Sequence, residues 1–414
     1  MDAMPAYDAD NRPLRPTFQQ WRERVSVQVP IAPNQIGTDQ PRYFWMDTLC
    51  VPVSPSNIRK DAIVSMREVY SGASRALVLD TDLRSSSIFT SPEEKLSRIT
   101  CSSWVHRLWT LQEGALVPKL YFQFAEAPFL FELYPNRDSE EKQYDNPIGE
   151  MAQQNEFTRK VLTLAPLDKM AWTFQSLRSR ATSRDGDQAI CIATLLDIDL
   201  AELLSVPESD RVRKLWSMFK NVPAATLFLP GKKLQDPVHG WAPANCMDCG
   251  HLGMPLDVSA AITLEGVRVS LPGFFIPSPV QPVDSVIAVS LQSTIFYVRK
   301  NTKFGGASWD GLNLHKVPRL AVLLPKDPCK GGRVQLVASI AALVSVVREE
   351  EDECCVEYLR FVSVISQGCR HDFAANPAWS AKEEVEKEMI GQASLIQGNQ
   401  KWLISGVRPV YTST

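Results

Sequence analysis

The residues best suited to chemistry gather in one short stretch, SSWVHRLWTLQEGALVPKLYFQ (residues 102–123). It holds a single carboxylate, Glu113, close in sequence to Trp104, Arg107 and Trp109. Apolar residues recur at helical spacing along two neighbouring stripes, so the spacing predicts a helix that is buried on most sides. We therefore expect Glu113 at a buried edge or in a cleft. There the carboxylate either pairs with an arginine or belongs to a functional site.

Apolar runs alternate with helical patterns around this stretch. Residues 43–50 (YFWMDTLC), 75–80 (RALVLD) and 119–124 (KLYFQF) are short, nearly continuous apolar runs, typical of strands buried on both faces. A helix is expected over 57–72 between the first two runs, with Gly72 as its end. The order strand, helix, strand, helix, strand predicts an α/β fold with a parallel sheet and helices on its faces.

Two aspartates lie where ligands bind in such sheets, at the carboxyl ends of the strands. Asp47 is near the end of the first expected strand, and Asp80 ends the second, so both could face the same cleft as Glu113. Helix capping or turn formation explains these two aspartates equally well. For Cys50, a small core residue is favoured over a nucleophile, because no histidine is near it in sequence.

Other candidates favour structural roles. Arg107 either holds the helix to a neighbouring acid, which we favour, or reaches a ligand phosphate. His106 suits a partly exposed helix histidine better than a base in the cleft. Cys246 and Cys249 have a CxxC spacing with His251 nearby, but no second pair of ligands is close in sequence, so we expect no metal site.

The patterning divides the chain into four regions. Residues 1–41 are rich in proline and polar residues and are expected to be poorly ordered, and the α/β region covers 42–125. Residues 148–222 have a helical pattern, and 223–414 a β-rich one. The candidate helices after the α/β region are 148–164, 167–179, 187–196, 209–219 and an exposed one at 380–391. The stretches 82–95 and 125–147 are expected to be loops, and the acidic run 349–353 a turn between two strands.

Composition restricts the class of protein. The chain has 414 residues and a net charge of −3, so no general attraction to nucleic acid or membrane surfaces is expected. Its most continuous apolar stretch, 334–347, is short of the roughly 20 residues that a spanning helix needs. Nine cysteines at irregular spacings, with no secretory signal pattern, indicate free thiols in a reducing, cytoplasmic location.

Three motifs resemble a known family. Residues 43–52 (YFWMDTLCVP) resemble the W-I-D-x-L-C-I motif of the fungal heterokaryon incompatibility (HET) domain. Residues 66–80 (MREVYSGASRALVLD) resemble its M-x-x-I-Y-x-x-A-x-x-V-L-V segment, and 104–113 (WVHRLWTLQE) its R-x-W-T-x-Q-E motif, which includes Gln112. Residues 180–196 (RATSRDGDQAICIATLL) and 240–245 (GWAPAN) are similar to segments that follow the domain in many members.

The resemblance implies a fold and a candidate reaction. HET domains are regarded as similar to TIR domains, which have a parallel sheet, and several TIR domains hydrolyse NAD with a glutamate four residues after a tryptophan. Trp109 and Glu113 have that spacing, which makes Glu113 the candidate catalytic residue and NAD a candidate substrate, with no bound cofactor. Cleavage of the nicotinamide–ribose bond builds positive charge on the ribose, which a nearby carboxylate can stabilise.

Three interpretations of function follow from the resemblance. The first is a fungal HET-domain protein in self/non-self recognition and programmed cell death, acting through protein partners, self-association included. The second is an NAD glycohydrolase that uses Glu113, favoured by the Trp109–Glu113 pair. The third is a non-catalytic interaction or scaffold protein. It is favoured over the second because residues 1–42 lack the L-S-Y-x-W-G motif that opens the family pattern.

Overall fold

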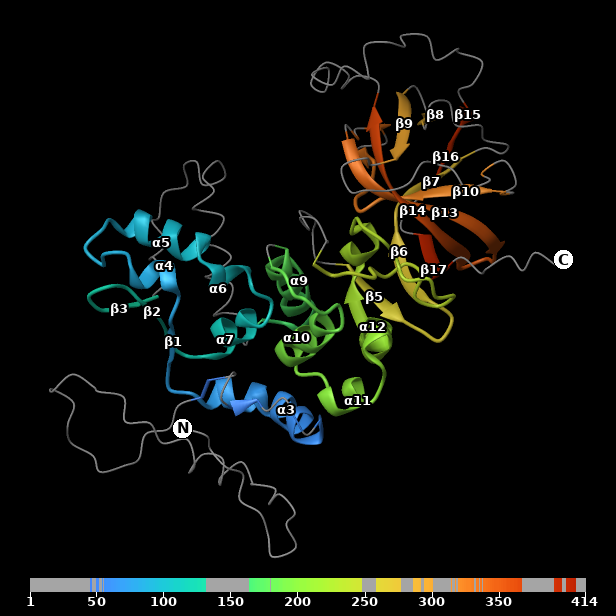
Figure 1. Cartoon of the computed structure of the whole chain (residues 1–414). Helices are drawn as coiled ribbons and strands as arrows, with labels where there is room; N and C mark the ends of the chain where they lie inside the picture. Colours follow the sequence, from blue (N-terminus) through green and yellow to red (C-terminus); the bar gives the residue numbers. More distant parts are fainter. Residues whose placement is uncertain are drawn as a thin grey trace, which may run out of the picture. The chain divides into compact units, whose positions relative to one another are not determined.

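The described part of the chain falls into two units. The computed structural model describes residues 45–46, 50–51, 54, 56–131, 164–178, 180–247, 258–276, 286–291, 294–300, 314, 317, 319–330, 333–334, 336, 338–366, 391–396 and 400–406 (Figure 1). The units are Met1–Ser74 and Arg75–Thr414, and the division falls inside the α/β region expected at 42–125. The poorly ordered segment expected at 1–41 lies outside the described residues. So do the expected helices at 148–164 and 380–391, apart from one residue of each.

The first unit contains the helix that the sequence predicts after its first motif. This helix, α3, spans Ser56–Gly72, so the expected stop at Gly72 is confirmed. Its most buried side chains are Ile63, Met66 and Tyr70, which recur at helical spacing.

The buried strand expected at 43–50 is wrong over the residues that the structure describes there. Trp45 and Met46 belong to no strand, and Met46 is 41% exposed. Cys50 is helical, and its N–H donates to the Met46 carbonyl at 2.8 Å, the spacing of an α-helical turn. A short apolar run has the same composition in a strand and in a buried helical turn, so composition alone does not separate the two.

The second unit begins with a small mixed sheet. Its strands are β1 (Ala76–Val78), β2 (Leu120–Gln123) and β3 (Pro128–Leu130). The parallel pairing of β1 with β2 confirms the prediction for the second and third expected strands. β3 pairs antiparallel with β2, inside a stretch expected to be a loop, because Phe129 and Leu130 supply apolar side chains there. The described chain is therefore mixed α and β, and the parallel TIR-like sheet implied by the resemblance stays a prediction.

Two short helices overlap the stretch 82–95, which was expected to be a loop. They are α4 (Thr81–Arg84), capped by Asp80, and α5 (Pro92–Cys101), capped by the Ser91 hydroxyl. Both have a hydrogen-bonding residue directly before the first helical turn, and α5 also has proline at its first position. The capping alternative weighed for Asp80 is thus the one that the structure supports.

Helices follow as the sequence predicts, drawn in green in Figure 1. They are α9 (Pro166–Leu177), α10 (Asp187–Leu196), α11 (Leu200–Leu204), the 3-10 turn η3 (Glu208–Asp210) and α12 (Arg211–Met218). The predicted helices at 167–179, 187–196 and 209–219 correspond to α9, α10 and the pair η3–α12. α10 is buried over most of its circumference, since residues 188–195 are all buried.

The C-terminal part is β-rich, as predicted. Its strands are β4 (Asn221–Pro223), β5 (Ser259–Ile262), β6 (Val267–Leu271), β7 (Gly273–Ile276), β8 (Val286–Leu291), β9 (Thr294–Lys300), β10 (Leu320–Leu323), β11 (Cys329–Lys330), β12 (Arg333–Val334), β13 (Ala338–Glu349), β14 (Cys354–Ser366), β15 (Gly391–Gln392), β16 (Ser394–Leu395) and β17 (Gln400–Gly406). The main sheet has the order β16-β7-β10-β13-β14-β17-β6-β5-β4. The acidic run forms the turn between β13 and β14, where the Glu350 N–H donates to the Glu353 carbonyl at 3.0 Å.

Some of these strands close into a ring. β14 pairs with β9 through its second half, and β9 pairs with β8. The segment 391–395 then joins the two ends, because β15 pairs with β8 and β16 pairs with β7. The interior is packed with apolar side chains from β7, β8, β9, β10, β13 and β14, including Phe274, Phe296 and Val364, all fully buried. The ring is therefore filled by an apolar core.

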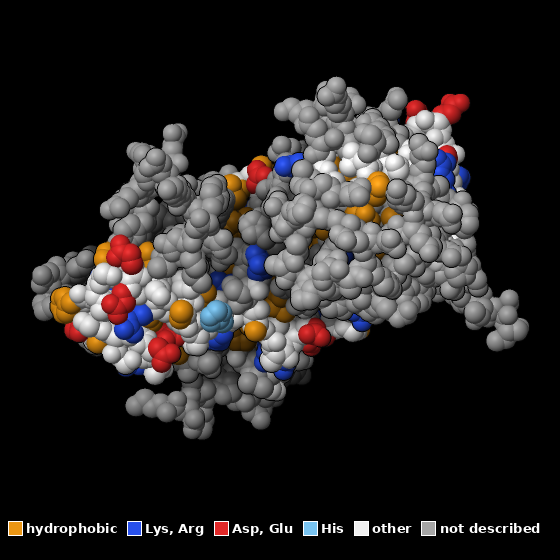
Figure 2. All heavy atoms as spheres, turned by 90° about the horizontal axis from the view of Figure 1, so that it is seen from above, with side chains coloured by type: hydrophobic (Ala, Val, Ile, Leu, Met, Phe, Trp, Pro, Cys, Tyr) orange, Lys and Arg blue, Asp and Glu red, His pale blue; other side chains and the backbone are white. Residues whose placement is uncertain are grey.

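Charges of both signs are interspersed on the described surface in the view of Figure 2. A few large apolar side chains are exposed on their own, as is normal for a folded chain. They include Phe89 at 84% and Leu264 at 95%. Within the described residues, none of the helices has the length and apolar character needed to cross a membrane.

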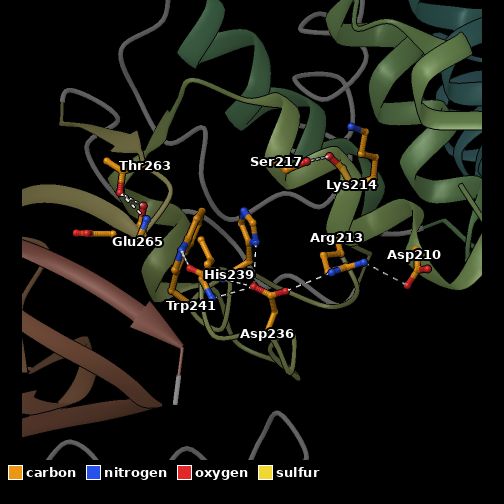
Figure 3. A network of polar contacts seen from close by, with 11 residues as sticks. Asp210, Arg213, Lys214, Ser217, Asp236, His239, Trp241, Thr263 and Glu265 are labelled. Atoms are coloured by element: carbon orange, nitrogen blue, oxygen red, sulfur yellow. Dashed lines mark hydrogen bonds and ion pairs between the residues drawn. The ribbon is translucent and has the colours of Figure 1, made fainter. Parts of the chain in front are cut away.

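The loop that includes the GWAPAN segment lies between η4 (Ala224–Phe228) and β5 and makes hydrogen bonds to the helices and to the large sheet; part of its polar network is shown in Figure 3. The Asp236 carboxylate accepts hydrogen bonds from the N–H groups of Val238 and His239 at 2.9 and 2.7 Å. It also lies 3.0 Å from the His239 ring Nδ1 and 3.7 Å from an Arg213 nitrogen on α12. Burial alone would raise the pKa of Asp236, but these hydrogen bonds outweigh it and hold the pKa below its usual value.

The same loop is hydrogen-bonded to three other elements. The Trp216 indole N–H on α12 donates to the Pro243 carbonyl at 3.1 Å, and the Cys246 N–H donates to the Gln188 side chain on α10 at 2.7 Å. At the sheet, the Gly406 N–H of β17 donates to the Pro237 carbonyl at 2.9 Å. The resemblance singled out this segment, and its structural role is to connect α10, α12 and β17.

We predict that Gly406→Ala destabilises the protein by about 1–3 kcal/mol, the usual cost of overpacking. A Cβ atom at residue 406 would overlap the Asp236 carbonyl oxygen and the backbone of Gly240. Urea unfolding followed by circular dichroism measures the change. Gly72→Ala is the matched control, since a Cβ there meets no atom within 4 Å. Equal midpoints for the two variants would contradict the prediction.

Candidate functional site

The helix expected within residues 102–123 is broken in the middle. Its first piece, α6, spans Ser103–His106, and its second, α7, spans Thr110–Leu116. Arg107 between them has extended backbone, with φ −82° and ψ 137°. No glycine or proline lies at the break, and Trp109 at the start of α7 makes no side-chain capping bond. Contacts from elsewhere in the chain therefore impose the break.

Those contacts come from the residues just before α10. Arg107 forms an isolated parallel β-bridge with Ala181. The Leu108 N–H donates to the Ala181 carbonyl at 3.0 Å, and the Ala181 N–H donates to the His106 carbonyl at 2.7 Å. Backbone groups that a continuous helix would pair internally are thus paired with another segment.

The Arg180 side chain adds to these backbone contacts. We call the segment Arg180–Asp187, which supplies them, the clamp. One guanidinium nitrogen donates to the Arg107 carbonyl at 2.8 Å and to the Thr110 hydroxyl at 2.9 Å. The Arg180 Nε donates to the Ser176 carbonyl on α9 at 3.1 Å. Burial lowers the pKa of Arg180 to about 10, against the raising effects of Cys191 and Glu113, so the guanidinium stays charged at neutral pH.

The break brings Glu113 to Trp104. The Trp104 indole N–H donates to the Glu113 carboxylate at 3.1 Å, and Glu113 is half-buried. The Trp104 ring packs edge-on against Phe122 of β2, with the ring centroids 5.4 Å apart. It also lies over Gly114, where a Cβ would come within 3.0 Å of the ring. The carboxylate is therefore held by a tryptophan that is itself fixed on the small sheet.

Asp80 anchors the start of α6. One carboxylate oxygen accepts from the N–H groups of Asp82 and Leu83, and the other accepts from the Ser103 hydroxyl at 2.8 Å and the Trp104 N–H at 3.4 Å. Burial alone would raise the pKa of Asp80, but these hydrogen bonds outweigh it and lower the pKa from its ordinary value of 3.8. An ionised Asp80 thus connects the end of β1 to the helix that carries Trp104.

Trp109 faces a different partner from the one its spacing suggested. Its indole N–H donates to the Asp187 carboxylate at 2.9 Å, and the Thr182 hydroxyl donates to the same oxygen at 3.2 Å. Next to them is Cys191, fully buried, whose thiol lies 3.7 Å from the Leu108 carbonyl. Burial raises the pKa of Cys191 to about 12, so this thiol is protonated and unsuited to nucleophilic chemistry.

The structure thus places the candidate residues in distinct settings. Trp104, Glu113 and Asp80 form one hydrogen-bonded chain, and Gln112 is buried beside Cys191, where its backbone hydrogen bond opposes in small part the rise that burial causes in the Cys191 pKa. The side chains of Arg107 and His106 are exposed. Cys50 is buried and lies in the first unit. Asp47, Cys249 and His251 lie outside the described residues.

Sequence reasoning missed four contributors: Ser103, Thr110, Arg180 and Asp187. Arg180 and Asp187 lie in the stretch 180–196, which the resemblance singled out, yet nothing in the spacing joins that stretch to the tryptophans. The only local signal was the half-buried carboxylate, for which an arginine partner was one of the two alternatives. Arg180 is the arginine whose charge interacts with Glu113.

The arrangement has two chemical capacities. A carboxylate oriented by an indole N–H can stabilise positive charge that develops on a ligand. The Arg180 guanidinium also joins two distant stretches of chain, through its hydrogen bonds to the Arg107 carbonyl and the Thr110 hydroxyl.

We predict that Asp80→Asn lowers the free energy of unfolding by about 1–3 kcal/mol at neutral pH, because buried donors lose a charged acceptor. Since the folded pKa of Asp80 is lowered, its stabilisation is present above pH 3.8 and is lost as the pH falls through the folded pKa. Urea unfolding at several pH values measures both effects.

Asp82→Asn is the matched control, because Asp82 is exposed in the same helical turn. The difference between the two variants should shrink toward low pH. A difference that stays constant from neutral pH down to acid unfolding would contradict the assigned role of the Asp80 charge.

Comparisons with known proteins agree with the motifs. Residues 17–94 match the family model described as Heterokaryon incompatibility protein (HET). The match contains the first two motifs, at 43–52 and 66–80, and ends before the third. It also includes residues 17–42, where the opening family motif is missing.

A curated relative has the same family in its name. Vegetative incompatibility protein HET-E-1 of Podospora anserina is 27% identical over 175 residues, which cover 40% of this chain and 12% of that protein. The chain thus aligns with a small part of that relative's length. No solved structure matches the chain. The family match and the relative together identify the chain as one that carries a heterokaryon incompatibility (HET) domain.

Proposed function

We propose that this protein acts in heterokaryon incompatibility, as a self/non-self recognition protein whose HET domain triggers programmed cell death in the cytoplasm. The observation that carries the proposal is the family match at 17–94, supported by the relative named for vegetative incompatibility. HET-E-1 is a much longer protein, and the proposal transfers its role in incompatibility to a chain that aligns with 12% of its length.

Contacts in the structure support assigning different tasks to different parts of the chain. Asp80, at the end of β1 and inside the family match, holds Ser103 and Trp104 beyond the match. Arg180 and Asp187 in turn hold the break after Trp104. The part of the chain that triggers cell death therefore extends from the family match to about α10. The β-rich part supplies outer surfaces that bind protein partners, a second copy of the chain included.

Inducible expression of the full chain in a filamentous fungus tests this role. We expect growth arrest and loss of viability on induction, and a weaker response for Asp80→Asn, which disturbs the matched domain. Asp82→Asn should kill as the parent chain does. Normal growth, with the parent chain accumulating in folded form, would contradict the proposal.

A second candidate function is NAD hydrolysis at Glu113. The observation that favours it is the half-buried Glu113 carboxylate, oriented by the Trp104 indole at 3.1 Å. In this reaction Glu113 would stabilise positive charge on the ribose as nicotinamide leaves. NAD would be the substrate, and the chain would need no resident cofactor.

Nicotinamide release from NAD by the purified full chain, at high protein concentration, tests this activity. Glu113→Gln keeps the size of the side chain and removes its charge, so we expect release to fall by about 100-fold or more. Glu93→Gln, on the exposed side of α5, is the matched control and should keep full activity. A folded parent chain that releases no nicotinamide excludes the reaction.

A further inference from the structure

The break between α6 and α7 decides which group Glu113 meets. Trp104 and Glu113 are nine residues apart. In a continuous helix they would lie about 13 Å apart along the axis and on opposite sides, at ~100° per residue. In the bent form the Trp104 indole is 3.1 Å from the Glu113 carboxylate. The bend itself therefore creates this pair.

The local sequence favours the continuous form. Residues 103–116 contain no proline, and their apolar spacing is that of one buried helix. The start of α7 has tryptophan where serine, threonine, aspartate or asparagine is preferred, and it makes no side-chain cap. Gly114, one residue after Glu113, accommodates the Trp104 ring in the bent form.

Three contacts at the break favour the bent form, and these three come from one short segment. Within the described residues, this segment supplies the Ala181 backbone bridge, the Arg180 side chain and the Asp187 carboxylate that holds Trp109. Its outward side, at Ser183, Arg184 and Asp185, is exposed. The clamp is therefore accessible to another molecule.

We propose that residues 103–116 adopt two conformations, the bent one and a continuous helix, and that the segment Arg180–Asp187 selects between them. When the segment is docked, Glu113 is bound to Trp104. When a partner displaces it, the helix straightens and Glu113 moves into one row with Trp109, four residues earlier. A binding event on 180–187 is thereby converted into a change at Glu113.

Indole N–H resonances of the full chain in nitrogen-15 NMR test the switch. Trp104→Phe and Trp109→Phe assign the two signals, and Glu113→Ala gives the Trp104 position without its carboxylate partner. Ala181→Pro removes the N–H that donates to the His106 carbonyl. We expect Ala181→Pro to move the Trp104 signal to its Glu113→Ala position, with an increase in helical circular dichroism.

Arg180→Gln provides a milder opening of the clamp if Ala181→Pro does not fold. It should shift the Trp104 signal in the same direction. Arg178→Gln, an exposed arginine directly after α9, should leave the signal in place. A Trp104 signal that stays at its parent position in a folded clamp variant, while the Trp109 signal moves, would overturn the switch.

A disulfide lock gives the opposite perturbation. Neighbouring strands bring bridged residues within disulfide range, and both Arg107 and Ala181 are exposed. The pair Arg107→Cys with Ala181→Cys is made in a Cys101→Ser background, because Cys101 is an exposed free thiol. In the oxidised form, Arg180→Gln should no longer move the Trp104 signal, and reduction should restore its effect. These signals report neither cell death nor NAD cleavage, so the switch can fail while the proposed function holds, and the reverse.

Discussion

Two backbone hydrogen bonds, from Leu108 to Ala181 and from Ala181 to His106, constrain the whole candidate site. They keep α6 and α7 separate at a point where the sequence has no glycine or proline to end a helix. Because of that bend, one tryptophan reaches Glu113 and the next reaches Asp187. The site is thus built from two stretches more than sixty residues apart, and neither stretch specifies it alone.

What the sequence predicts well is what short-range pattern determines. The helix ending at Gly72, α10 at Asp187–Leu196 and the parallel pairing of β1 with β2 follow from periodicity, end signals and element order. The strand expected at 43–50 is wrong at the residues described there, since its composition fits a buried helical turn equally well. The break at Arg107 escaped prediction because its cause lies in Ala181, a residue with no distinctive chemistry.

The family match and the structural unit do not have the same boundaries. The match ends at residue 94, yet Asp80 inside it is bound to Ser103 and Trp104 outside it. Farther on, the loop around Asp236 connects α10 and α12 to β17 through hydrogen bonds on each side. A change in the β-rich part therefore has a continuous path of contacts to the clamp on Glu113, through α10 and Asp187.

The ring of strands has a consequence for how the protein is made. β7 and β8 pair with the segment 391–395, which follows them in the chain only after β9, β10, β13 and β14. On the ribosome these strands emerge with one edge unpaired and wait for that segment before their apolar faces are enclosed. Such late, long-range closure is slow and leaves the nascent chain exposed to aggregation. A chaperone that shields β8 during synthesis would therefore benefit this half of the protein more than the helical half.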